Sequence, residues 1–360
     1  MSKADKDNLH NDSDPLFTEG LNPDPEKLIP GRNVDFTILK DLVGKDIVSV
    51  TQFDKKMVVE LTKFAALLQA TEITKSHPLD GKLIITAFFE ASTRTRLSFE
   101  SAVLRLDGKI MTITEARQTG VAKGESLEDI GEMFNAYGDL VIMRHTETDA
   151  IERIKKNLRL PLINAGNGTG EHPTQALADW FALLKWRPDL VSENLSSEKK
   201  IHLGIIGTPG SMRAVKSFLI MSLLFNTAIR EISIISEMAD PLGEEVIKLL
   251  DEKNIKYNIY SGIQEVLEDL DVIYMNSIAF LGDSYRSLDQ RFKLHENSSL
   301  KPNTVVMHPL ARLDELSPML DGTNHNLYFT QAHGAVFVRQ ALMISVLNGF
   351  GRLPSELIEQ

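Results

Sequence analysis

Short apolar segments alternate with longer amphipathic segments along most of the chain, and this alternation constrains the fold more than any other feature. The segment LIITAFF, Leu83–Phe89, is nearly all apolar, as expected of a strand that is buried on both faces. Strands of this kind joined by helices predict parallel sheets that are covered by helices on both sides. The expected strands are Leu83–Phe89, Asp139–Arg144, Leu160–Gly166, Ile201–Gly207, Glu231–Ser236, Lys256–Tyr260, Asp271–Met275 and Thr304–His308, and helices are expected at Leu97–Leu106, Gln175–Trp186, Arg213–Phe225 and around Leu342–Leu347.

A chain of 360 residues is long enough for two domains that each bury a core of their own. The polar segment Arg187–Lys200 follows an expected helix and contains a proline and several serines, so it is the best candidate for the domain boundary. Residues 1–30 are rich in Asp, Asn, Lys and Pro, which predicts a flexible N-terminal extension.

The charge balance limits the classes of ligand. Fifty Asp and Glu residues against 39 Lys and Arg residues give a net charge of −11, which disfavours nucleic acid and anionic membrane surfaces as partners. A local group of arginines can nevertheless hold a small anionic substrate.

The absence of cysteine excludes disulfides, zinc sites with cysteine ligands and thiol catalysis. The polar N-terminus and the lack of an apolar run of about 20 residues predict a cytoplasmic protein. The histidines His202, His295 and His325 lack the spacing of metal ligands, so no metal site is expected.

The segment FFEASTRTRLSFES, Phe88–Ser101, ends an expected strand and begins an expected helix. Ser92 and Thr93 are typical N-cap residues, because their side-chain oxygens accept backbone N–H groups. Arg94 and Arg96 fall in the first turn, where the helix dipole favours negative charge by about 0.3–1 kcal/mol. Arginines placed against this preference indicate a bound anion, and a phosphate would satisfy the N–H groups, the hydroxyls and the guanidinium groups together. The alternative is a solvated helix start whose arginines point into water.

This turn and five further motifs occur in the order known from one enzyme family. The run S-T-R-T-R after F-F-E resembles the carbamoyl phosphate signature of the aspartate and ornithine carbamoyltransferases, with Ala91 at a variable position. The resemblance covers nearly the whole chain beyond the N-terminal extension and continues through Val121–Ser126, Val141–His145, Glu171–Asp179, His308–Arg312 and Phe337–Leu342.

The resemblance implies a carbamoyl phosphate-binding domain at residues 31–180, completed by a returning C-terminal helix at residues 335–360. In this family, phosphate is held at the positions of Ser92, Thr93, Arg94 and Thr95. Thr95, Arg144 and His172 would donate to the carbonyl oxygen, and Gln175 would bind the carbamoyl amino group. Fixed donors of this kind stabilise the oxyanion that forms when an amine attacks the carbonyl carbon. Phosphate can take the amine proton as it leaves, so neither a cofactor nor a dedicated protein base is expected.

The resemblance implies that residues 190–333 bind the amino acid that accepts the carbamoyl group. Arg213 would bind the α-carboxylate of this substrate. The backbone carbonyl of Leu310 would accept a hydrogen bond from the substrate, with Arg312 close by. The arginine that binds the β-carboxylate of aspartate corresponds to Arg286 if an insertion is allowed, which also aligns Arg291 and Phe292. Without a gap, that position falls on Ser277 and the following glutamine on Ala279.

Lys123 lies in the polar segment QTGVAKGES. By itself it reads as a surface lysine. In aspartate carbamoyltransferases the matching lysine reaches into the active site of a neighbouring subunit, and Thr119 keeps the hydroxyl of a nearby family serine. The resemblance therefore implies a homotrimer with shared active sites, and it leaves regulatory chains open.

Several alternatives remain at this stage. An ornithine-specific enzyme would carry Cys-Leu-Pro where this chain has His308-Pro309-Leu310, but another acidic or modified amino acid could be the acceptor. A catalytically silent relative is a further alternative. Gly204, Gly207 and Gly210 resemble a dinucleotide-binding fingerprint, but their spacing differs from G-x-G-x-x-G. The expected reaction is transfer of the carbamoyl group from carbamoyl phosphate to L-aspartate.

Overall fold

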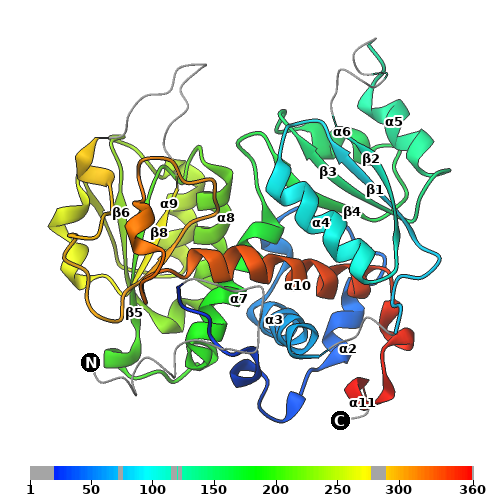
Figure 1. Cartoon of the computed structure of the whole chain (residues 1–360). Helices are drawn as coiled ribbons and strands as arrows, with labels where there is room; N and C mark the ends of the chain where they lie inside the picture. Colours follow the sequence, from blue (N-terminus) through cyan, green and yellow to red (C-terminus); the bar gives the residue numbers. More distant parts are fainter. Residues whose placement is uncertain (1–19, 72–75, 115–119, 121–123, 277–288, 359–360) are drawn as a thin grey trace. The chain divides into compact units, whose positions relative to one another are not determined.

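The computed structural model describes residues 20–71, 76–114, 120, 124–276 and 289–358. They separate into two compact units, which are described one at a time below (Figure 1). The first unit contains Pro25–Phe181 and the chain from Gly334 onward. The second unit contains Ala182–His333 together with the residues that precede Pro25.

The first unit is built on a parallel sheet whose described strands have the order β2-β1-β3-β4. Strand β1 pairs with β3 so that Phe88 lies opposite Arg144, and β3 pairs with β4 so that His145 lies opposite Asn167. Because the strands are parallel, the segments that follow β1, β3 and β4 leave the sheet at the same edge. The strands are β1 (Leu83–Phe88), β2 (Lys109–Ile113), β3 (Leu140–His145) and β4 (Leu162–Asn167).

Helices cover both faces of this sheet. On one face, the Glu100 carboxylate of α4 (Thr93–Arg105) accepts hydrogen bonds from Thr86 on β1 and Thr112 on β2. On the other face, α5 (Leu127–Phe134) and α6 (Ala150–Lys155) pack with the strand side chains that point the opposite way, including Ile85, Ala87, Val141 and Met143. The unit also contains α2 (Phe36–Leu39), α3 (Lys55–Ala70) and α11 (Ser355–Ile358).

The second unit contains another parallel sheet, with its described strands in the order β7-β6-β5-β8-β9. One face of this sheet is covered by short 3-10 helices, by loops and by the start of α10, which bury Phe292, Leu316 and Tyr328 against it. On the other face, Phe218 of α8 stacks on Tyr274 of β8 with ring centroids 4.0 Å apart. The elements are β5 (Ile201–Ile206), α8 (Arg213–Ser222), β6 (Ile229–Ile235), α9 (Gly243–Glu252), β7 (Tyr257–Tyr260), β8 (Val272–Met275) and β9 (Val305–Met307).

Two long helices belong partly to each unit: α7 (Pro173–Trp186) leaves the first unit after Phe181, and α10 (Tyr328–Val346) returns to it at Gly334. A Cβ atom built on Gly334 would lie 2.9 Å from the Phe181 ring, so these helices are in close contact there. Short 3-10 helices occur at Pro25–Leu28, Pro30–Arg32, Lys40–Leu42, Val50–Gln52, Pro188–Val191, Ser197–Lys199, Leu223–Ala228, Ile263–Glu265, Leu267–Asp269, Gln290–Phe292, Pro318–Leu320 and Gly349–Arg352.

The structure confirms the predicted fold class of two parallel sheets flanked by helices, with a C-terminal helix that returns to the first unit. The eight expected strands are present, and no strand end is shifted by more than two residues. Strand β2 was not predicted, because it lies at the edge of the sheet and its sequence KIMTI alternates less clearly between apolar and polar residues. Residues 1–19 of the expected flexible extension lie outside the described residues, whereas Leu21, Leu28 and Ile29 are buried.

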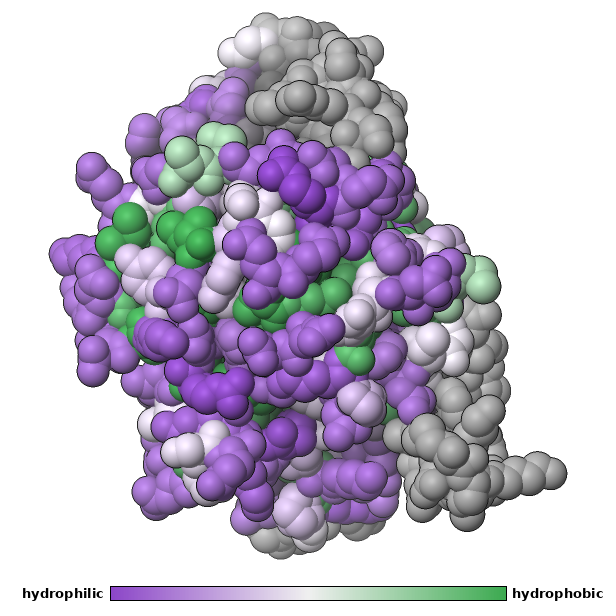
Figure 2. Space-filling model, turned by 90° about the vertical axis from the view of Figure 1, so that its left-hand side faces the viewer, coloured by the Kyte–Doolittle hydropathy of each residue, from purple (hydrophilic) through white to green (hydrophobic). Residues whose placement is uncertain are grey.

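The face of the molecule in Figure 2 is mostly hydrophilic, with hydrophobic residues in small separate areas. Within the described ranges, no helix is both long enough and apolar enough to cross a lipid bilayer.

Candidate active site

The turn between β1 and α4 has the features of an anion site. Ser92 is the N-cap of α4 in an extended conformation, and its hydroxyl makes no capping hydrogen bond. No acidic residue lies in the first turn of the helix to balance its dipole. The Ser92 hydroxyl and the first N–H groups of α4 are therefore suitable donors for a bound anion.

The two arginines of this turn have different environments. The Arg96 side chain is 30% exposed, and its Nε lies 3.9 Å from the Glu100 carboxylate, one turn further along α4. Arg94 is exposed, and no carboxylate among the described residues forms an ion pair with it. Arg94 is therefore the cation of this turn that can bind a ligand without first breaking an ion pair.

Arg144 lies at the carboxyl end of β3, beside the end of β1. Its Nη2 donates to Oε1 of Glu90 at 2.6 Å, and its Nη1 donates to the carbonyl of Ala165 at 3.4 Å. Because Glu90 precedes Ser92 by two residues, this bond ties the anion-binding turn to the end of β3. The sequence interpretation did not assign a role to Glu90. The signal available in the sequence was a carboxylate two residues before the Ser92–Arg96 motif.

His172 and Gln175 mark the start of α7, which follows β4. His172 is 4% exposed, and its Nδ1 lies 3.5 Å from the Thr174 hydroxyl. The Nε2 of Gln175 donates to Oδ1 of Asp179 at 2.7 Å. Because β1, β3 and β4 are neighbours in the sheet, the segments bearing Ser92, Arg144 and His172 leave the sheet at one edge.

Glu171 fixes the loop before α7. Its carboxylate accepts hydrogen bonds from the Val50 N–H and the Ser49 hydroxyl, each at 2.7 Å. The side chain of Asn164 on β4 donates to Asn167 and to the Val48 carbonyl. These bonds hold the backbone before His172 in one conformation.

In the second unit, Arg213 is the first residue of α8 and is partly exposed. The N-cap residue is Met212, which provides no side-chain hydrogen bond to the helix. Its sulfur instead lies 3.2 Å from the backbone nitrogen of Thr208 and packs against Gly207. This is another helix start with a basic residue and no acidic residue in its first turn, which is the arrangement expected of a carboxylate-binding site.

The loop after β9 is held by a buried pair, His308 and Glu315, which are 1% exposed. The His308 Nδ1 accepts from the Leu310 N–H at 2.8 Å, so the proton of a neutral ring lies on Nε2, which donates to Glu315 at 2.8 Å. Glu315 also accepts from the Leu313 N–H at 2.9 Å. Leu310 has a left-handed φ of 54° and is joined to Ala311 by a cis peptide bond. The pair thus fixes the backbone on both sides of Leu310.

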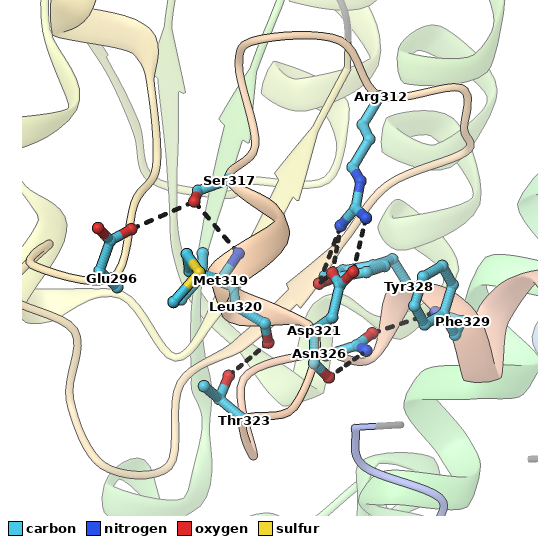
Figure 3. A network of polar contacts seen from close by, with 10 residues as sticks. All are labelled: Glu296, Arg312, Ser317, Met319, Leu320, Asp321, Thr323, Asn326, Tyr328 and Phe329. Atoms are coloured by element: carbon cyan, nitrogen blue, oxygen red, sulfur yellow. Dashed lines mark hydrogen bonds and ion pairs between the residues drawn. The ribbon is translucent and has the colours of Figure 1, made fainter. Parts of the chain in front are cut away.

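Arg312 is engaged by the protein itself (Figure 3). Its two terminal nitrogens donate to the two carboxylate oxygens of Asp321, and Tyr328 donates its hydroxyl to the same carboxylate. The guanidinium group also lies 5.5 Å from the ring centre of Tyr328 and 5.6 Å from that of Phe329. Burial is the main cause that raises the pKa of Tyr328, and the Asp321 charge adds to it. These contacts give Arg312 a structural role near Leu310.

Two predicted site residues, Lys123 and Arg286, lie outside the described residues, as do Thr119, Ser277 and Ala279. Their roles, like those of the other predicted site residues, stay predictions. In the described part of the chain, no group of three or more His, Asp or Glu side chains is arranged to hold a metal ion.

Family models match both halves of the chain. The model described as aspartate/ornithine carbamoyltransferase, carbamoyl-P binding domain, matches residues 45–185, and the Asp/Orn binding domain of the same family matches residues 199–346. The chain belongs to the aspartate/ornithine carbamoyltransferase family. The resemblance stated from the sequence motifs is thereby confirmed.

Members of the family with curated names are about one third identical to the chain. The aspartate carbamoyltransferase catalytic subunit of Methanobrevibacter smithii is 33% identical over 313 residues, which cover 84% of the chain and 95% of that protein. The multifunctional protein CAD of Squalus acanthias is 35% identical over 322 residues, or 87% of the chain, and the chain spans only 14% of its length.

Solved structures of the family agree. Aspartate transcarbamoylase from Trypanosoma cruzi in complex with carbamoyl phosphate and aspartate aligns with a TM-score of 0.75 and 30% identity, over 86% of the chain and 98% of that structure. The complex of the same enzyme with N-(phosphonacetyl)-L-aspartic acid aligns with a TM-score of 0.75 and 28% identity, over 86% and 97%.

The Glu315→Gln variant tests whether the His308–Glu315 pair holds the loop. We expect a loss of about 1–3 kcal/mol in unfolding free energy at neutral pH, because the buried His308 Nε2–H loses its charged acceptor. Burial would raise the pKa of Glu315, but the hydrogen bonds from His308 and from the Leu313 N–H outweigh it and keep this pKa below its usual value of 4.5. The stabilisation is therefore present above pH 4.5 and is lost as the pH falls through the lower pKa of the folded state.

Urea unfolding followed by circular dichroism, at neutral pH and at several values below 4.5, measures this effect. The wild-type and Glu315→Gln curves should converge in acid. Glu268→Gln, a change to an exposed carboxylate of the same unit, is the control and should leave both curves unchanged. A stability difference that is equal at all pH values would contradict the hydrogen bond from His308 to an ionised Glu315.

Proposed function

We propose that this protein transfers the carbamoyl group of carbamoyl phosphate to L-aspartate, giving N-carbamoyl-L-aspartate and phosphate, a reaction of pyrimidine biosynthesis. The observation that carries the proposal is the start of α4, where Ser92 makes no capping hydrogen bond and Arg94 has no ion-pair partner among the described residues, so both offer donors for a phosphate group. The names of relatives from the same family, and the ligands named for the Trypanosoma cruzi enzyme, support the same substrates.

In the proposed mechanism, Ser92, Thr93, Arg94 and Thr95 bind the phosphate group of carbamoyl phosphate. The guanidinium group of Arg94 and the dipole of α4 both favour a ligand with two negative charges at this position. Gln175 binds the carbamoyl amino group through its side-chain oxygen. The first unit is then the carbamoyl phosphate-binding domain.

Thr95, Arg144 and His172 stabilise the carbonyl oxygen. The aspartate amino nitrogen attacks the carbonyl carbon, a C–N bond forms, and negative charge collects on that oxygen in a tetrahedral intermediate. The C–O bond to phosphate then breaks, and the departing phosphate takes a proton from the nitrogen. Most of the rate enhancement comes from positioning the two substrates and from donors that are already in place.

We assign aspartate binding to the second unit. Arg213 binds the α-carboxylate, the carbonyl of Leu310 accepts a hydrogen bond from the amino group, and Arg286 binds the β-carboxylate. The rigid loop around Leu310 supports this assignment, since a carbonyl that orients a nucleophile must itself be fixed.

We further propose a homotrimer in which Lys123 of one subunit completes the site of its neighbour. The exposed apolar side chains of Leu97 and Leu104 on α4 and of Met111 on β2 are consistent with contacts between subunits in this unit. A cytoplasmic location agrees with a chain that contains no cysteine.

Assays of carbamoyl phosphate with a panel of amino acids test the proposed acceptor. L-Aspartate should be used at least about 100-fold more efficiently in kcat/KM than L-asparagine or L-ornithine, because a site built for two carboxylates rejects an analogue that leaves one arginine unpaired. L-Glutamate keeps both carboxylates but is one methylene longer, so it should be used about 10-fold less efficiently or worse. Product formation is measured as N-carbamoyl amino acid and released phosphate.

Preference for another amino acid would overturn the choice of aspartate. The register around Arg286 is tested separately with Arg286→Ala, which should raise the aspartate KM and leave the carbamoyl phosphate affinity unchanged. If Ser277→Arg improves aspartate use instead, the alignment without a gap is correct.

Arg94→Ala tests the phosphate site directly. Calorimetric titration with inorganic phosphate and carbamoyl phosphate should give Kd values about 10- to 100-fold higher than wild type, because a charged hydrogen bond to the phosphate is lost. Arg105→Ala is the matched control: Arg105 lies on the same helix but bonds Ser101 in the last turns, so its loss should not change the affinity. Equal affinities of Arg94→Ala and wild type would refute the site.

Mixing inactive Lys123→Ala subunits with inactive His172→Ala subunits tests the shared site. In randomly mixed trimers, roughly one site in four receives both intact residues, so about a quarter of wild-type activity should return. The mixed composition is verified by native mass spectrometry. Mixed trimers that remain inactive would show that sites are not shared.

A further inference from the structure

A buried carboxylate accompanies the predicted carbamoyl-binding glutamine. Asp179 lies one helical turn after Gln175 on α7 and is 0% exposed, and its Oδ1 accepts the Gln175 Nε2–H at 2.7 Å. A buried carboxylate needs compensating charge and hydrogen bonds, so its retention beside a site residue calls for an explanation.

This contact determines which end of the Gln175 amide faces away from Asp179. An ionised carboxylate has acceptors only, so the amide must present its NH₂ group to Asp179. The side-chain oxygen Oε1 is then the end left for a ligand. An amide turned by 180° would bring two acceptors together at Asp179.

The carbamoyl group requires this orientation. Its amino group is a donor, so Gln175 must offer an acceptor, and an NH₂ group in that place would meet another donor and lose the hydrogen bond. Acetyl phosphate has the same shape but carries a methyl group at this position. The orientation of Gln175 therefore distinguishes a carbamoyl from an acetyl group.

We propose that Asp179 is a positioning residue that fixes the Gln175 amide with its oxygen toward the carbamoyl amino group. The inference rests on the proposed function, because it gives Gln175 a carbamoyl ligand. It adds a source of specificity for carbamoyl over acetyl groups, although Asp179 itself does not contact the ligand.

The test is a double-mutant cycle read out as substrate discrimination. Kd values for carbamoyl phosphate, acetyl phosphate and inorganic phosphate are measured by calorimetry on the full chain, as wild type, Asp179→Asn, Gln175→Leu and the double variant. Asp179→Asn should reduce the preference for carbamoyl over acetyl phosphate about three- to tenfold, since an amide at position 179 accepts either orientation of Gln175. The inorganic phosphate Kd should stay within about twofold of wild type, because phosphate does not use Gln175.

Gln175→Leu should abolish the preference, and adding Asp179→Asn to it should change the preference no further. A purely structural role of Asp179 would weaken binding of all three ligands alike, or would persist in the Gln175→Leu background, and either result overturns the proposal. The matched control Glu132→Gln, at an exposed pair with Arg159, should change none of the three Kd values.

If wild-type protein itself does not prefer carbamoyl phosphate to acetyl phosphate, the proposed function of Gln175 fails. A wild-type preference that Asp179→Asn leaves intact would overturn only the role of Asp179.

Discussion

Parallel pairing in the first sheet is the constraint on which the candidate site depends. Because Phe88 lies opposite Arg144 and His145 opposite Asn167, the loops after β1, β3 and β4 emerge side by side from one edge. The residues that follow these strands are far apart in the sequence, and a shift in register would change which of them meet. The side chains of β1, β3 and β4 are mostly apolar and buried on both faces of the sheet. Polar side chains are therefore placed mainly where these strands end.

Charge is arranged differently around each cation of that edge. Arg96 lies near Glu100 and Arg144 bonds Glu90, whereas Arg94 is exposed and unpaired among the described residues. A helix start that carries positive charge is unfavourable until an anion binds. Because Arg94 has no such partner, its environment would change more than that of Arg96 or Arg144 on binding of a phosphate. The contacts of Arg96 and Arg144 are present without a ligand and hold the turn in place.

The second unit relies on buried hydrogen bonds rather than on a helix start alone. His308 and Glu315 hold the backbone around Leu310, and Asp321 and Tyr328 engage Arg312. Each of these polar groups is satisfied by a specific partner, so the loop has one conformation in which a backbone carbonyl can orient an amino group. Strand β9 and helix α10 supply the framework for both networks.

The sequence by itself determined the alternation of apolar strands and helices, the parallel sheets, and the family, because these follow from local patterns and from motifs such as Ser92–Arg96. It also identified Arg144, His172 and Gln175 as candidates. Only the tertiary structure decided which groups are bonded to them: Glu90 accepts from Arg144, and Asp179 accepts from Gln175. Strand β2 was missed because the sequence of this edge strand alternates only weakly, and the strand is defined by its pairing with β1. Strand pairing and ion pairs depend on contacts between segments that are distant in the chain, and local periodicity does not record such contacts.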